Sequence, residues 1–276
     1  MNFWISILEW MNTQMTAPAL YGGFHIFWLA MVLVATVLLC TKARRVTPHR
    51  VANLVLVTAV ISIMLEIYKQ INYTFTVTDG VITASYLWYA FPWQFCSTPM
   101  YIGLLAGILR KGKIHDCLCS YLATYAVFAG LCVMLYPGDV FCGTMGINIQ
   151  TMFCHGSMIV VGIYLVVSGH VKASWKSILK ALPVFAATIG VAMILNEWAY
   201  RTGLLENHNF NMFYISPYCD PHLPIYSDVQ RVVPYPWSLI IYIAGFTAAA
   251  FIMLQLGIAV RKLTVRCRKV AAHHGK

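Results

Sequence analysis

The sequence predicts an all-α membrane protein, a bundle of seven transmembrane helices with the N-terminus outside and the C-terminus in the cytoplasm. Of its 276 residues, 60% are hydrophobic and 10% are charged, whereas soluble domains carry roughly 25% charged residues. The mean hydropathy of +0.70 agrees with this class. Seven apolar stretches each approach the roughly 20 residues that cross about 30 Å of hydrocarbon. They lie near 22–41, 50–71, 91–109, 114–136, 147–168, 178–199 and 237–260.

Lys and Arg are concentrated in alternate connections between these stretches. They fill residues 42–50, 110–113, 172–180 and the tail from 261 onward, whereas the other connections hold only Arg201 and Arg231. Basic loops remain in the cytoplasm, which sets the orientation. We therefore attribute the net charge of +10 to topology and to contact with anionic lipid, and we expect no nucleic acid partner.

The segments outside the spans complete the predicted architecture, which we interpret as one domain over residues 1–276. Residues 3–10 lack the basic start of a cleavable signal peptide and predict a short interfacial helix on the outer surface. Residues 72–90 alternate apolar and polar side chains around Asp79-Gly80, which indicates a β-hairpin. Residues 200–236 form a long, proline-rich segment of the kind that covers or binds ligands.

The third span, 91–109, is the shortest, and we expect its helix to begin with Pro92 in the first turn. Two of the nine cysteines, Cys142 and Cys219, lie in connections predicted to be outside. In an oxidising compartment these two could form a disulfide, and the alternative is two reduced thiols.

Polar side chains are rare within the spans and fall toward the predicted outer end. Ionisable groups in hydrocarbon are costly unless they are paired or hydrated, so their common depth predicts a functional pocket. In one span, Glu66, Lys69 and Gln70 have the i, i+3 and i+4 spacing that allows mutual pairing. The full set is Glu66, Lys69, Gln94, Cys96, His155, Asn196 and Glu197.

This set of side chains can support covalent acyl transfer. A thiolate at Cys96 would be the nucleophile, and His155 would move its proton. A carboxylate could orient the imidazole, and Gln94 or an Asn could donate to the oxyanion. The competing interpretation is structural, because a Cys in a span usually packs, a His often bonds a neighbouring helix, and Glu66 could simply pair with Lys69. We expect neither a metal nor a cofactor, since the chain contains no zinc, phosphate-loop or dinucleotide motif.

Three stretches resemble the YwaF-type family of integral membrane proteins, which includes transmembrane protein 164. They are FPWQFCSTPMYI (91–102), TMFCHGSMIVVGIYLV (151–166), and LNEWAYRTG (195–203) followed by NFNMFYISP (209–217). The resemblance implies a nucleophile at Cys96, a His at His155 and an Asn-rich substrate loop that contains Asn209 and Asn211. His25 and Glu66 also fall where the family tends to have a His and a Glu.

The resemblance implies a membrane-embedded acyltransferase or transacylase that moves a fatty acyl chain through a Cys thioester to a lysolipid-type acceptor. Its partner would be a membrane phospholipid or lysolipid, in the plasma membrane of a bacterium or the endoplasmic reticulum of a eukaryote. Related androgen-induced membrane proteins are Thr-dependent ester hydrolases, so a lipid ester hydrolase is one alternative, with Thr98 as a second nucleophile candidate. A transporter or sensor with a polar solute or proton site, and a structural scaffold, are two further interpretations of the same residues. The oligomeric state stays open.

Overall fold

The computed structural model describes residues 3–43, 46–138, 140–206, 209–219 and 223–274. Arg44, Arg45 and Lys276, which belong to the predicted charge pattern, lie outside these residues, as do the side chains of Arg268 and Lys269. The helices are α1 (Phe3–Met11), α2 (Gly23–Lys42), α3 (Pro48–Asn72), α4 (Thr98–Leu109), α5 (Lys113–Leu122), α6 (Tyr125–Leu135), α7 (Met145–Val167), α8 (Lys176–Arg201), α9 (Tyr226–Val232) and α10 (Trp237–His274). Short 3-10 turns follow at η2 (Trp88–Ala90), η3 (Leu204–Glu206) and η4 (Met212–Tyr214).

Six helical segments of the described chain are long and apolar enough to cross a membrane. Four of them, α2, α3, α7 and α8, match predicted spans within two residues at each end, whereas α10 begins at the predicted residue and continues to His274, well beyond the predicted end at 260. The sixth runs from Lys113 to Leu135 and combines α5 with α6, which are separated by a turn at Ala123 and Thr124.

The predicted third span is only partly helical, so the count of seven full-length helices is not confirmed. Residues 91–97 form turns, and α4 begins at Thr98 rather than near Phe91. Its 12 residues cover about 18 Å, which is too short to cross the hydrocarbon. Pro99 fits the first turn of α4, and Pro92 disfavours helical geometry at Phe91.

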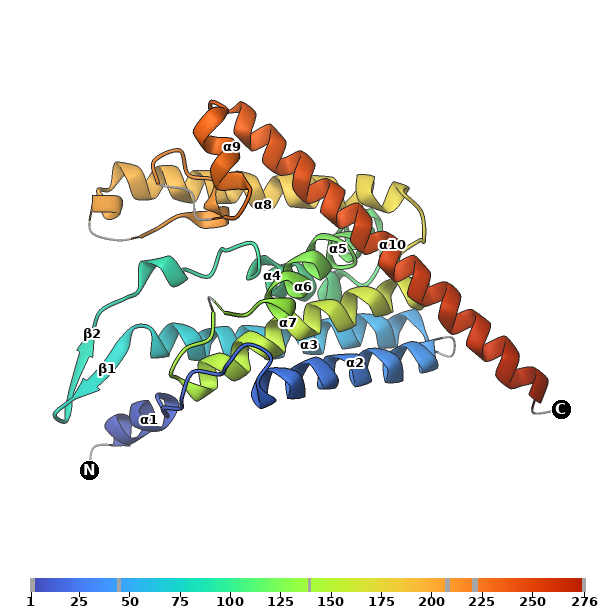
Figure 1. Ribbon diagram of the computed structural model, residues 1–276, viewed down its shortest axis with the longest axis horizontal. Coiled ribbons are helices and arrows are strands. Elements are labelled where there is room, and N and C mark those ends of the chain that lie inside the picture. Colours follow the sequence, from blue (N-terminus) through green and yellow to red (C-terminus); the bar gives the residue numbers. More distant parts are fainter. Residues whose placement is uncertain (1–2, 44–45, 139, 207–208, 220–222, 275–276) are drawn as a thin grey trace.

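Helix α7 lies at the centre of the bundle and packs against α2, α3, α6 and α10. Its contact with α6 is close because both helices use glycine. A Cβ on Gly130 would approach His155 O to 2.5 Å, and a Cβ on Gly162 would approach Val127 to 2.1 Å. Helix α10 crosses the bundle at a steep angle (Figure 1). This tight α6–α7 packing fixes the face of α7 that carries His155.

The two ends of the bundle differ in the way that the charge pattern predicts. Helix α1, the hairpin and the end of α8 lie at one end, whereas the end of α2, the start of α3, the start of α8 and the end of α10 lie at the other (Figure 1). We call the first the hairpin end and the second the basic end. Which end faces the cytoplasm stays a prediction.

The predicted hairpin is confirmed: β1 (Phe75–Thr78) and β2 (Val81–Ala84) pair antiparallel, with Thr78 opposite Val81. Asp79 and Gly80 both have positive φ, of 52° and 75°, as a tight two-residue turn requires. The expected N-terminal helix is also present as α1, and it exposes Trp4 and Trp10. Its position at a membrane interface stays a prediction.

The disulfide option for Cys142 and Cys219 is not realised. Both sulfur atoms are thiols. The Cys142 thiol lies 3.8 Å from Thr144 O, and the Cys219 thiol lies 3.5 Å from Phe210 O. Each thiol therefore has a local backbone acceptor rather than a sulfur partner.

Candidate active site

A cavity of about 1160 Å³ opens among α3, α4, α6, α7 and α10. Small-molecule pockets usually measure about 300–1,000 Å³, so this cavity is large enough for a lipid-sized ligand. Most of its lining is apolar, and its charged pair, Glu66 and Lys69, lies near the end of α3 that leads to the hairpin. Along α3 the lining runs from Val55 to Lys69, a distance of about 21 Å. The cavity is therefore elongated and amphipathic.

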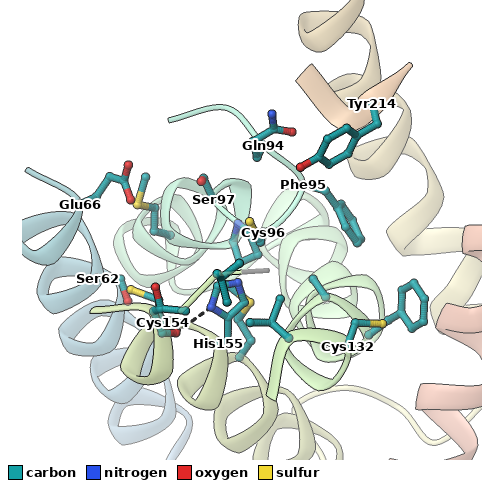
Figure 2. Close-up of a pocket in the computed structure, with 18 of the residues that line it drawn as sticks. Ser62, Glu66, Gln94, Phe95, Cys96, Ser97, Cys132, Cys154, His155 and Tyr214 are labelled. Atoms are coloured by element: carbon teal, nitrogen blue, oxygen red, sulfur yellow. Dashed lines mark hydrogen bonds between the residues drawn. The ribbon is translucent and has the colours of Figure 1, made fainter. Parts of the chain in front are cut away.

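Cys96 lines this cavity from the turn that precedes α4, two residues before the first helical residue. The N–H groups of Ser97 and Thr98 both donate to Gln94 O, at 2.8 and 3.2 Å, which fixes the turn. Cys96 thus lies at the amino end of α4, where a helix carries partial positive charge. Figure 2 shows Cys96 between the Gln94 and His155 levels of the cavity. Its position is thus favourable for a nucleophile.

His155 lines the same cavity from the middle of α7 and is 7% exposed. Its Nδ1 lies 2.7 Å from Thr151 O (Figure 2). A carbonyl oxygen only accepts, so Nδ1 carries the proton and Nε2 keeps its lone pair. Nε2 is buried and has no hydrogen-bond partner among the residues that the structure describes. The structure therefore presents a neutral imidazole with a basic nitrogen that no described protein group uses.

Cys96 and His155 share the cavity, and no direct hydrogen bond joins them. Figure 2 draws the imidazole below the Cys96 side chain. The buried Nε2 atom lacks any partner in the described part of the chain, the Cys96 thiol included. Catalytic hydrogen bonds are often long or poorly aligned before substrate binds, so contact within direct or one-water reach stays a prediction.

Glu66 is held by three side chains within the bundle. Its Oε1 accepts from Lys69 Nζ and Gln70 Nε2, each at 2.7 Å, and its Oε2 accepts from Gln150 Nε2 at 3.2 Å. The predicted pairing of Glu66, Lys69 and Gln70 on one face of the helix is confirmed. Because these donors occupy the carboxylate and Thr151 O already orients His155, Glu66 does not take the orienting role that the sequence allowed.

Gln94 and Asn196 fasten residues 209–217 to the bundle. Gln94 Nε2 donates to Asn211 O, and Phe213 N donates to Gln94 Oε1, both at 3.0 Å. Asn196 binds both backbone groups of Met212, donating to its O at 3.0 Å and accepting from its N at 2.7 Å. The Gln94 amide is thereby engaged away from Cys96, and we assign it to positioning rather than to the oxyanion.

The two asparagines of the substrate loop predicted from the resemblance, Asn209 and Asn211, differ in burial. Asn211 is buried, and its Oδ1 accepts from Ser216 N at 3.0 Å, so its side chain shapes the loop. Asn209 is exposed, and neither Asn lines the cavity. Segment 200–236 does contribute to the cavity wall, through Tyr214, residues 223–226 and Val229.

Three candidates, His25, Asn196 and Glu197, do not line the cavity, and this corrects the sequence-based set. His25 is fully buried between α2 and α6, where Nδ1 accepts from Tyr21 N at 3.0 Å and Nε2 donates to Met134 O at 2.8 Å. Glu197 pairs on the surface with Arg201 at 2.6 Å and Tyr218 at 2.7 Å. Successive helix residues differ by about 100° in direction, so Glu197 points outward while buried Asn196 points inward.

Thr98, the alternative nucleophile, is fully buried and does not line the cavity. Its hydroxyl lies 2.8 Å from the Tyr121 hydroxyl and donates to Phe95 O at 3.0 Å. These contacts make Thr98 part of the packing below the turn, so the structure does not support it as a nucleophile.

The family model of the TMEM164 family matches residues 20–255. The chain belongs to the TMEM164 family. No curated protein and no solved structure matches it. Family membership and the six apolar helices together identify an integral, multi-pass membrane protein. The similarity to transmembrane protein 164 that the sequence indicated is thus confirmed.

Three polar residues that line the cavity of this TMEM164 family member were not among the candidates predicted from the sequence. Gln150, Cys154 and Ser62 all line the cavity, and Gln150 Nε2 lies 3.7 Å from Cys154 Sγ. A Gln in an apolar span is costly, and its i, i+4 spacing to Cys154 places both on one helix face. That signal was present, but only the structure shows that this face meets Glu66.

Proposed function

We propose that this TMEM164 family member is a membrane-embedded acyltransferase that carries a fatty acyl chain as a thioester on Cys96. One observation carries the proposal: the buried Nε2 of His155 has no partner among the described residues and lines the cavity that also contains Cys96. An unpaired buried nitrogen costs free energy, so its retention favours a functional partner. The size and apolar lining of the cavity support a lipid substrate.

In the first half-reaction, His155 Nε2 accepts the thiol proton of Cys96. The thiolate sulfur attacks the carbonyl carbon of an acyl ester, a carbon–sulfur bond forms, and the carbon–oxygen bond of the ester breaks. The leaving alkoxide takes the proton back from His155 and departs as a lysolipid. The bond from Nδ1 to Thr151 O keeps the imidazole in the required tautomer throughout.

In the second half-reaction, the hydroxyl of a lysolipid acceptor gives its proton to His155 and attacks the thioester carbonyl. The carbon–sulfur bond breaks, the sulfur leaves as a thiolate, and His155 returns the proton to it. Water in place of the acceptor would make the same site a lipid ester hydrolase. The transporter alternative needs no bond to Cys96, and this difference separates the two classes experimentally.

Lipid reaches the cavity laterally in this proposal, between α6 and the α9–α10 region. Several residues line the cavity and are also exposed on the molecular surface there. Cys132 and Tyr136 are exposed on α6 and its end, and Ile225 and Ile241 are exposed on the opposite side. Apolar side chains at such an opening suit acyl chains in a bilayer. With the proposed orientation, the hairpin end and the headgroup level lie in the outer leaflet.

The test is acyl labelling of the purified full-length protein with a phospholipid radiolabelled in its acyl chains. Wild-type protein should carry label that hydroxylamine releases, and Cys96→Ser should carry none, because a hydroxyl is scarcely ionised and cannot form a thioester. His155→Ala should lose turnover by about 10²–10⁴-fold. The double variant should be little worse than either single variant, because the two residues act as a unit.

Two matched cysteine variants serve as controls. Cys154→Ser changes another thiol of the cavity, and Cys119→Ser changes a buried thiol that lies 3.4 Å from His115 Nε2 outside the cavity. Both should keep the label. Label on Cys96→Ser would remove Cys96 as the nucleophile. Lipid binding or transport by wild-type protein without any label would favour the solute-site alternative.

A further inference from the structure

Lys69 presents an ammonium group with unused donors to the cavity. Its side chain is 15% exposed and lines the cavity. An ammonium has three N–H donors, and Glu66 Oε1, at 2.7 Å, is the hydrogen-bonding partner that the described residues supply. The remaining donors have no partner among the described residues, and the cavity that Lys69 lines can hold an anionic oxygen.

Glu66 acts as the fixed base of this arrangement. Gln70 and Gln150 donate to its two oxygens, and Gln70 also donates to Ala90 O at 2.9 Å. The carboxylate is thus anchored from both α3 and α7, and it holds Lys69 in place one turn further along α3.

The cavity wall has no net charge among the described residues. Lys69 supplies +1 and Glu66 supplies −1, and the other described lining residues are neutral when His155 is neutral. An uncompensated charge is costly in such a low-dielectric space. A ligand that carries both a phosphate and an ammonium leaves the sum at zero, whereas a ligand with a net negative headgroup does not.

The order of groups along the helices matches the order of groups in a glycerophospholipid. The hydrogen bond from Gln150 to Glu66 brings α3 and α7 to one level near the hairpin end. His155 lies five residues further along α7, about 7–8 Å toward the basic end, and Met158 and Val161 continue the lining beyond it. In a glycerophospholipid, the phosphate, the ester carbonyl and the acyl chain follow one another in this same order.

We propose that Lys69 binds the phosphodiester of a zwitterionic glycerophospholipid, such as one with a phosphoethanolamine or phosphocholine headgroup, and that Glu66 sets this preference by cancelling the charge of Lys69. The inference rests on the proposed function for the lipid nature of the substrate. Lys69 is thus a binding residue that selects the headgroup, and it places the ester near Cys96.

The test measures lipid binding in a Cys96→Ser background, so that no turnover changes the lipid. Full-length protein is equilibrated in bicelles that contain equal amounts of phosphatidylethanolamine and phosphatidylglycerol with identical acyl chains. The bound lipids are then counted by native mass spectrometry. The protein with Lys69 and Glu66 intact should retain more phosphatidylethanolamine. Glu66→Gln gives the wall a charge of +1 and should shift the ratio toward phosphatidylglycerol by about tenfold or more.

Two further arms separate headgroup recognition from general damage. Lys69→Gln should lower binding of both phospholipids and leave binding of a diacylglycerol with the same chains unchanged, whereas Lys69→Arg should retain phospholipid binding. If the ratio of bound phosphatidylethanolamine to phosphatidylglycerol is the same in every variant, the inference is overturned. The same holds if Lys69→Gln loses diacylglycerol binding as much as phospholipid binding, and Glu66 and Lys69 would then be a structural ion pair. Because binding is read without acyl label, failure of the thioester proposal would leave this result intact, and failure here would leave the thioester result intact.

Discussion

Replacing Gln94 by alanine tests whether this side chain holds residues 209–217 over the cavity. The substitution removes the acceptor for Phe213 N–H and the donor to Asn211 O together. Phe213 is fully buried and Asn211 is 4% exposed, so neither backbone group has easy access to water. Alanine keeps the Cβ and leaves the backbone of the turn free to keep its geometry.

The expected cost follows from these two orphaned groups. A buried donor or acceptor without a partner costs about 1–3 kcal/mol, so Gln94→Ala should lower the free energy of unfolding by about 2–6 kcal/mol if the loop stays in place. At about 2–4 °C per kcal/mol for a chain of this size class, Tm should fall by at least about 4 °C. If residues 209–217 are released into water, the free energy of unfolding falls by less. The effect of the substitution then appears as increased sensitivity of the loop to proteolysis.

The assay pairs thermal unfolding in detergent with limited proteolysis. Gln94→Ala and Asn196→Ala should each lower Tm and expose a cleavage site within residues 200–236. The double variant should cost less than the sum, because a loop freed by the first change has less to lose from the second. Gln14→Ala is the matched control, since the exposed Gln14 amide donates to Asn12 only two residues away.

Unchanged Tm together with unchanged proteolysis in Gln94→Ala would refute this reasoning. It would mean that water or a neighbouring group replaces the amide at no cost. The Gln94 amide could then act as a donor to the oxyanion instead, and a loss of acyl labelling in Gln94→Ala would show this role.

The remaining predictions concern lipid access, topology and the cysteine framework. Gly245 lines the cavity with open space at its Cβ position, so Gly245→Trp should narrow the cavity and lower acyl transfer, whereas Gly190→Trp, which also has open space but lies outside the lining, should not. Single cysteines in 72–90 and 200–236 should react with an impermeant maleimide from outside, and those in 169–180 only after permeabilisation. Non-reducing and reducing gels of the purified protein should show equal mobility, because Cys142 is a thiol.

The long helices could be predicted from the sequence because the hydrocarbon thickness sets a length that apolar stretches must meet. The hairpin was also predictable, since Asp79 and Gly80 accept the positive φ values of the turn. The start of α4 was not. A run such as FPWQF is apolar whether it is helical or coiled into turns, and Pro92 fits the first turn of a helix as well as it fits a bend. Contacts from residues 211–213, far along the chain, stabilise the turn.

The site was predicted to the extent that depth in the membrane determines it. Their similar predicted depth grouped five residues, and all five line one cavity: Glu66, Lys69, Gln94, Cys96 and His155. Depth says nothing of direction around a helix. The same reasoning therefore also included the outward-facing Glu197 of α8, and it missed Gln150 of α7, which donates to Glu66.

The unwound start of the third span connects residues 209–217, Cys96 and the cavity. Irregular backbone at membrane depth is tolerated where it is buried in protein or lines a cavity, and residues 91–97 meet this condition through the Gln94 side chain and the cavity wall. A continuous helix would place Cys96 within a run of backbone hydrogen bonds, away from any helix end. Because the helix starts at Thr98 instead, the thiol lies at its positive end. Gln94 precedes Cys96 by two residues and is hydrogen-bonded to Asn211 and Phe213, so a single side chain connects that loop to the turn that carries the proposed nucleophile.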